Sequence, residues 1–344
     1  MEQNKRWYQT AGPDGDVVIS TRIRLARNLT EYPFPSCMTD EQKYNICITI
    51  KEAAQTRCHN VGRFDYLDMT QVPQIQGVSM VEKHLISPDF AKGNPGTSLL
   101  LTADESISLM INEEDHIRLQ VMRPGLMLDD AYDVADKLDT ILDEELHFAF
   151  DERLGYLTQC PSNLGTGMRA SLMLHLPALE EKKALNHLIQ TVSKLGLTIR
   201  GIYGEGSGSQ GSIYQLSNQV SLGISEKAAI HNLKSIAEQI IREERQARED
   251  LCHSIRFVDR VWRSVGILSY AYALSSEECM TLFSNVIMGC STGILKDITY
   301  EDIHAIMQEI QPATLTVSAN AEWNVEERDI ARANKVRKVF RKDE

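Results

Sequence analysis

One segment of the sequence, residues 97–124, restricts the fold most strongly. It reads TSLLLTADESISLMINEEDHIRLQVMRP and contains two β-rich runs on either side of a polar turn at residues 103–105. Two such runs joined by a short turn predict an antiparallel hairpin. We expect its second strand to carry the polar side chains of Asn112, Glu114, His116 and Arg118.

Strand and helix patterns alternate up to about residue 250, and only helical patterns follow. Helices are predicted over residues 39–60, 128–150, 177–196 and 225–250, and helix starts at Thr39 or Asp40, near Pro177, and at Ser225, Ser275 or Ser276, Thr299 and Asn324. These patterns predict an α+β fold. A mainly antiparallel β-sheet flanked by helices would occupy residues 1–250, and a small all-α domain residues 251–344.

Charge and composition argue against several function classes. The net charge of −12 is unlike that of a nucleic-acid-binding protein, which needs a basic surface. The longest apolar run, VGILSYAYAL, is too short to span a bilayer, and the N-terminal residues lack the apolar core of a signal peptide, so we expect a cytoplasmic protein without a membrane partner. None of the seven cysteines has CxxC spacing, which argues against a disulfide framework or a zinc site.

Five arginines lie in predicted strands or beside glycine turns, namely Arg22, Arg24, Arg118, Arg169 and Arg200. The strand period of DVVISTRIRLARNL places Arg22 and Arg24 on one face. Arginine is costly to bury without an anion, and guanidinium groups match phosphate oxygens, so the set predicts a triphosphate site. Glu114 and Glu205 lie among these arginines, which suggests phosphate transfer to a cationic acceptor.

A glycine-rich segment, GEGSGSQGS, contains GxGxxG at Gly206, Gly208 and Gly211. A dinucleotide-binding fold requires a strand before this motif and a helix after it. Here SIYQLSNQVSL follows and predicts a strand, so we interpret the segment as a loop between two strands.

Four motif blocks together resemble those of the phosphagen kinases, the ATP:guanidino phosphotransferases. They are STRIRLARN, NEEDHIRLQ, CPSNLGTGMRAS and RGIYGEG, in the order of that family, and the resemblance covers residues 12–250. It implies a phosphagen-kinase catalytic domain with MgATP as the phosphate donor. The family binds phosphate with five arginines, and the positions that match them here are Arg22, Arg24, Arg118, Arg169 and Arg200.

The same resemblance implies roles for five further residues. Ser20 would lie beside the nucleotide, and His84 in EKHLI matches a histidine on the adenine side. Glu114 and Glu205 match the two carboxylates that hold the acceptor guanidinium, one of them acting as base, and Cys160 matches the active-site cysteine. The glycines of CPSNLGTG are expected to let the backbone approach the nucleotide.

Two departures point to the protein arginine kinases within this family. First, members of the family that act on free arginine or creatine have a helical domain of about a hundred residues before the first motif, but only nineteen residues precede Ser20 here. Second, the predicted helical domain of this sequence follows the motifs. The resemblance implies phosphorylation of exposed arginines in proteins, which marks them for a ClpC-type AAA+ unfoldase and protease. It also implies a small activator protein, a transcriptional repressor as one substrate, and a homodimer.

The sequence RDIARA resembles a phosphoarginine-binding motif of the same kinases, with Arg328, Asp329 and Arg332 as the binding residues. The alternative interpretation is a solvated helix face with an i,i+3 ion pair. Three alternative functions also remain open at this stage: a kinase of a free small guanidino compound, a non-catalytic adaptor that reads phosphoarginine, and, by fold analogy alone, a carboxylate–amine ligase like glutamine synthetase.

Overall fold

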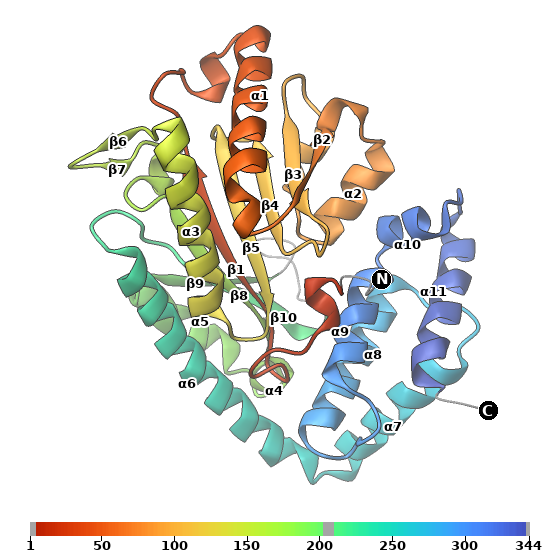
Figure 1. Cartoon of the computed structure of the whole chain (residues 1–344). Coiled ribbons are helices and arrows are strands. Elements are labelled where there is room, and N and C mark those ends of the chain that lie inside the picture. The colour runs from red at the N-terminus through yellow and green to blue at the C-terminus, as the bar shows by residue number, and fades with distance from the viewer. Residues whose placement is uncertain (1–4, 202–209, 342–344) are drawn as a thin grey trace.

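The computed structural model describes residues 5–201 and 210–341, and its centre is an eight-stranded sheet (Figure 1). The strand order is β2-β3-β4-β5-β1-β8-β10-β9, and each neighbouring pair is antiparallel. The bounds are β1 Val18–Arg27, β2 Phe64–Asp68, β3 Ser98–Thr102, β4 Ile107–Ile111, β5 Ile117–Pro124, β8 Met168–His175, β9 Leu197–Gly201 and β10 Ile213–Asn218, with β6 Phe150–Asp151 and β7 Gly155–Tyr156 forming a separate ribbon. The predicted α+β class is confirmed.

Helices cover one face of this sheet and continue beyond it. Their bounds are α1 Asp40–Arg57, α2 Gln74–Glu82, α3 Leu128–Leu146, α4 Pro177–Glu181, α5 Leu185–Lys194, α6 Glu226–Cys252, α7 Ile255–Tyr270, α8 Ser276–Ser291, α9 Tyr300–Glu309, α10 Pro312–Ala319 and α11 Val325–Phe340. Helix α3 packs on β1 and β5, α5 on β9, and α6 on β8 and β10. Within the described ranges, no helix combines the length and the apolar character needed to cross a membrane.

Most of the predicted helix starts are confirmed, because the capping side chains accept hydrogen bonds from the first turn. The caps are Thr39, Ser225, Ser275, Thr299 and Asn324. At Asn324 the Glu327 side chain bonds back to the cap backbone, which completes a capping box.

Strand β1 runs through the middle of the sheet, and its alternating side chains define the two faces. Ile23 and Leu25 are fully buried in the main core, into which α3 contributes Leu138. Arg22 and Arg24 lie on the opposite face, where they line a cavity. The predicted common face of these two arginines is therefore confirmed.

Two predicted elements are each divided in the structure. The second run of the predicted hairpin forms two strands, β4 and β5, because Asn112 has a φ of 58° and donates its side-chain amide to the Gly96 carbonyl at 2.8 Å. Glu114 therefore lies in a turn rather than in a strand. The helix predicted over residues 177–196 ends after α4 and restarts as α5, because Lys183 has a left-handed φ of 58° that no helix accommodates.

The C-terminal helices pack directly against the sheet portion of the chain. The main apolar core is continuous from Val17 before β1 to Val336 in α11. At the end of α2, the Glu82 carboxylate accepts the backbone N–H groups of Ala313 and Thr314, at 2.8 and 2.7 Å, and so caps α10. The boundary predicted between residues 250 and 251 falls in the last turn of α6, and the division into two domains stays a prediction.

Candidate active site

The strand register gathers the five predicted phosphate-binding arginines on one face of the sheet. They lie on β1 (Arg22 and Arg24), β5 (Arg118), β8 (Arg169) and β9 (Arg200). Arg24 lies directly opposite Arg169, Arg118 opposite Ala26, and Arg200 opposite Gln215. Since side chains of one parity share a face, residues far apart in the sequence converge here.

Four of these arginines, Arg22, Arg24, Arg118 and Arg169, are partly buried, whereas Arg200 is exposed. Among the described residues, Glu113 is the carboxylate that forms an ion pair with one of these four, Arg118. Burial, and then the charges of Arg118 and Arg169, lower the pKa of Arg22 to about 10. The hydrogen bonds of Arg22 go to neutral side chains, including that of Gln215 at 3.2 Å. In the part of the chain that the structure describes, the Nε atoms of Arg24 and Arg169 are buried without a partner. Such a cluster fits a polyanion that would complete its hydrogen bonds.

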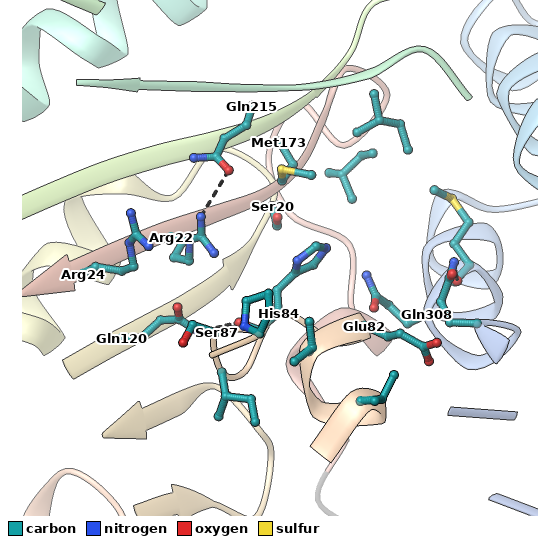
Figure 2. A pocket seen from close by; sticks show the side chains of 18 of the residues that line it. Ser20, Arg22, Arg24, Glu82, His84, Ser87, Gln120, Met173, Gln215 and Gln308 are labelled. Carbon is teal, nitrogen blue, oxygen red and sulfur yellow. Dashed lines mark hydrogen bonds between the residues drawn. The ribbon is translucent and has the colours of Figure 1, made fainter. Parts of the chain in front are cut away.

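A cavity of about 470 Å³ opens beside the arginines, between the sheet and the helices (Figure 2). Arg22, Arg24 and Arg118 line it together with Ser20 and His84, the two residues predicted to lie near a nucleotide. Its apolar lining is Ile19, Val78, Val81, Ile86, Pro88, Met110, Met173, Ile213, Met280 and Met307. An apolar cavity that ends in cationic side chains fits a nucleotide, with the base among the apolar residues and the phosphates on the arginines.

His84 lies in this cavity as a neutral imidazole. Burial, and then the charge of Arg22, lower its pKa to about 4. Its backbone is held in a left-handed conformation, with a φ of 60°, and its carbonyl accepts the Gln120 side-chain amide at 2.6 Å. A neutral ring is suited to contact an uncharged base.

A second cavity, of about 290 Å³, adjoins the first at the arginines. Arg24 and Arg118 line both cavities, and the second also contains Arg169, Glu114 and Cys160. The predicted phosphate clamp therefore separates a nucleotide-sized cavity from one that contains a carboxylate and a thiol. This is the order that in-line transfer from a nucleotide to a second substrate requires.

The environment of Glu114 favours its protonated form more than water does. Burial, and then the negative charges of Asp115 and Glu113, raise its pKa above the usual value of 4.5, while Arg118 and a hydrogen bond with Cys160 act in the opposite direction. The Cys160 sulfur also lies 3.0 Å from the Ser162 hydroxyl. A carboxylate with a raised pKa is a stronger base and is suited to accept a proton.

The turn that carries Glu114 is fixed by a buried residue that the sequence analysis did not single out. The Asp115 carboxylate accepts the Asn28 side-chain amide at 2.6 Å and the Gln159 backbone N–H at 2.7 Å. One carboxylate thus joins the end of β1, the turn and the residue before Cys160. Asp115 lies inside the NEEDHIR motif, and this position could have identified it in the sequence.

Glu113 is a second residue that the sequence analysis did not assign. It pairs with Arg118 at 2.6 Å and accepts the Ser87 hydroxyl at 2.6 Å. Burial would raise the pKa of Glu113, but Arg118 and the hydrogen bond from Ser87 outweigh burial and lower it. Glu113 therefore holds Arg118 in place as a carboxylate, and both Glu113 and its neighbour Glu114 line the second cavity.

The glycines of CPSNLGTG allow close packing within the protein, and Gly167 also lines the second cavity, while their approach to a nucleotide stays a prediction. A Cβ atom on Gly165, whose φ is 99°, would lie 2.2 Å from the Ser221 carbonyl oxygen. A Cβ atom on Gly167 would lie 2.6 Å from the Arg27 guanidinium, which is fully buried and donates to the Thr166 carbonyl at 2.9 Å. These glycines allow close packing of the loop on the protein itself, and Arg27 anchors that loop.

Among the described residues, Arg200, Arg328, Asp329 and Arg332 line neither of these cavities. Glu205, with Gly206 and Gly208, lies outside the described residues. In α11, Arg332 is 2% exposed, bonds to the carbonyls of Leu274 and Ile310 and pairs with Asp329, while Arg328 donates to the Trp323 carbonyl. The i,i+3 pair is present, but the arginine is buried rather than solvated.

No group of three or more potential protein metal ligands occurs among the residues described. The carboxylates nearest the arginines are engaged, since Glu113 bonds to Arg118 and Asp115 to Asn28. A divalent cation that accompanies a nucleotide often keeps phosphate and water as its main ligands, and this donor set fits that situation.

Comparisons with families and curated proteins agree with the geometry. Residues 45–247 match the family described as "ATP:guanido phosphotransferase, C-terminal catalytic domain", and residues 254–344 match "Protein-arginine kinase McsB C-terminal domain". The "Protein-arginine kinase" of Halothermothrix orenii is 46% identical over 333 residues, which cover 96% of this chain and 95% of that protein. The protein of the same description from Geobacillus sp. (strain WCH70) is 44% identical over 341 residues, with coverage of 98% and 94%.

Solved structures of other kinases have a similar overall fold. The substrate-free duplicated taurocyamine kinase from Schistosoma mansoni superposes with a TM-score of 0.59 at 29% identity, over 68% of this chain and 35% of that one. This chain thus spans only part of that duplicated protein. Lombricine kinase has a TM-score of 0.60 over 70% of this chain and 72% of its own, at 21% identity, which supports the fold alone.

Proposed function

Because the chain belongs to the ATP:guanido phosphotransferase family and to its protein-arginine kinase branch, we propose that it transfers the γ-phosphate of ATP to arginine side chains of proteins. One observation carries the proposal most directly. Two cavities meet at the partly buried Arg24 and Arg118, one of them sized for a nucleotide and the other containing Glu114 and Cys160.

In this proposal the base of ATP lies in the larger cavity, beside Ser20 and His84. The phosphates lie against Arg22, Arg24, Arg118, Arg169 and Arg200. There they supply acceptors to the Nε atoms of Arg24 and Arg169, which have no partner among the described residues. The accompanying Mg²⁺ would neutralise phosphate charge. The arginines stabilise the charge that develops on the transferring group, and they need no reorganisation because the sheet already holds them.

The acceptor guanidinium enters the second cavity. Such a group is protonated at neutral pH and is a poor nucleophile. Glu114 orients it and accepts the proton that leaves as the N–P bond forms and the bond between the γ-phosphorus and the bridging oxygen breaks, which releases ADP. The raised pKa of Glu114 supports this role. Cys160, beside Glu114, contacts the same guanidinium. Glu205, by family resemblance, is the second carboxylate.

The biological setting follows from the resemblance and is part of the proposal. Phosphorylated proteins would be delivered to a ClpC-type unfoldase and protease, with a small activator protein and a repressor substrate. A cytoplasmic location and a homodimer stay predictions. So does a phosphoarginine pocket at Arg328, Asp329 and Arg332, which would have to open around a guanidinium that already has partners.

The experiment compares two acceptors under the same conditions. The full chain is incubated with MgATP and either an unfolded basic protein or free arginine, and acid-labile phosphate is measured. We expect transfer to the protein. Transfer to free arginine alone would support the small-guanidine kinase instead, and no transfer to either would support a phosphoarginine-reading adaptor.

A further inference from the structure

The C-terminal helices form one wall of the proposed nucleotide cavity. Met280 in α8, Met307 and Gln308 in α9, and Gln311 before α10 line it. This wall is held in place from α2, because Glu82 caps α10 and the Ser79 hydroxyl lies 3.0 Å from that of Thr314. The cavity is therefore shared between two regions of the chain that match different families.

Gln308 is the unusual member of this wall. Its side-chain oxygen is buried and has no hydrogen-bond partner within the described chain. The neighbouring Gln311 is satisfied, since its amide nitrogen donates to the Met307 carbonyl at 3.0 Å. A buried acceptor without a donor lowers stability, so its presence in a binding cavity needs an explanation.

The position of Gln308 indicates which part of a nucleotide it would meet. Figure 2 shows Arg22 and Arg24 on one side of the cavity, Gln308 on the opposite side and His84 between them. A nucleotide with its phosphates on the arginines therefore directs its base toward Gln308. Adenine presents an exocyclic amino group, which is a hydrogen-bond donor of the kind that the Gln308 oxygen lacks.

We propose that Gln308 accepts a hydrogen bond from the exocyclic amino group of adenine, so that the C-terminal helices recognise the base of the nucleotide. The inference rests on the proposed function, because it needs the phosphates to occupy the arginine cluster. It goes beyond that function by giving the C-terminal region a part in the specificity of the catalytic site. The methionines beside Gln308 offer adaptable apolar contact to the ring.

The test measures binding rather than activity. Dissociation constants of ATP and of purine riboside 5′-triphosphate, which lacks only the amino group, are determined by calorimetry on the full chain. We expect wild-type protein to bind ATP roughly tenfold more tightly than the analogue, as one net hydrogen bond predicts. Gln308→Met, which keeps the size of the side chain, should bind both with the affinity of the analogue.

Two further variants make the result decisive. Gln308→Glu keeps an acceptor oxygen and should keep the preference for ATP, which also covers the case that Gln308→Met does not fold. Gln74→Met, at an exposed position on α2, should behave as wild type. A preference for ATP that survives in Gln308→Met, or that is lost in Gln308→Glu, would overturn the inference.

Failure of the inference is distinguishable from failure of the proposed function. If wild-type protein binds ATP and the analogue equally well, Gln308 does not read the amino group, while nucleotide binding still stands. If neither triphosphate binds, or if binding does not weaken in Arg24→Met, the nucleotide site itself is wrong and both proposals fail.

Discussion

Arg24 and Arg169 lie directly opposite each other on neighbouring strands, and the Nε atom of each is buried without a hydrogen-bond partner in the described structure. Two like charges in this arrangement oppose folding unless an anion joins them. The chain therefore holds a binding site that is organised before its ligand arrives, at a cost in stability.

Replacement of Arg24 should separate activity from stability. In Arg24→Met we expect phosphotransfer to fall by about 10²–10³-fold, because a preorganised charge is lost. The melting temperature without nucleotide should be unchanged or higher, because a buried unpaired charge is removed. Arg63→Met, at an exposed arginine, serves as the control. A variant that is both active and destabilised would contradict this account of the cluster.

The pH dependence of the rate should report on Glu114. Burial and neighbouring carboxylates raise its pKa above 4.5, and only the deprotonated form accepts a proton, so the rate should rise with pH through that raised pKa. Glu114→Gln should lower kcat by about 10²–10⁴-fold and remove this acidic limb. Exposed Glu31→Gln is the control. Full activity in Glu114→Gln would remove Glu114 from the catalytic role.

Cys160 offers a separate test of the acceptor side. Cys160→Ala should lower activity by orders of magnitude if its sulfur contacts the guanidinium together with Glu114. Cys37→Ala, at an exposed cysteine, should have no effect. Only a modest loss in Cys160→Ala would mean that the thiol fills space and takes no part in the chemistry.

Asp115 should act through its neighbours rather than by touching substrate. In Asp115→Ala, the Asn28 amide and the Gln159 N–H lose their acceptor, so we expect about 1–3 kcal/mol less stability against urea. Since the turn of Glu114 loosens, kcat should fall while the dissociation constant of ATP stays near that of wild type. A parallel loss of ATP affinity would mean that the effect is general unfolding.

A substitution at Gly165, in the loop before β8, should affect the stability of the fold. Gly165→Ala should destabilise the fold by more than about 1 kcal/mol, because the new Cβ would overlap the Ser221 carbonyl and the φ of 99° disfavours alanine. Gly266→Ala, in α7 and with open space around it, should not destabilise the fold. Equal effects of the two substitutions would show that the loop packs differently.

Local sequence patterns predicted much of the fold. The alternation in β1 predicted the shared face of Arg22 and Arg24, and helix caps such as Ser225 and Asn324 were found from residue type and spacing. The turn after β4 was missed because it depends on Asn112 bonding to Gly96, a contact between segments that no local pattern contains. The break at Lys183 was missed because lysine is a good helix former.

The sequence predicted the motif residues that are proposed to contact a ligand. It was less informative about the residues whose role is to contact other residues of the protein. Arg27 reads in the sequence like the other arginines of its motif, yet it lies on the opposite face of β1 and is bound to Asp139 of α3. The contribution of Gln308 depends on how the C-terminal helices pack on α2, and no local pattern encodes that packing.

The central claim is that arginine side chains of proteins receive the phosphate. The most direct measurement is mass spectrometry, under mildly acidic conditions, of an unfolded basic protein incubated with MgATP and the full chain. We predict phosphate on arginine residues with wild-type protein and at least about a hundredfold less with Glu114→Gln. Phosphate found only on serine, threonine or tyrosine, or equal arginine phosphorylation by both proteins, would contradict the account.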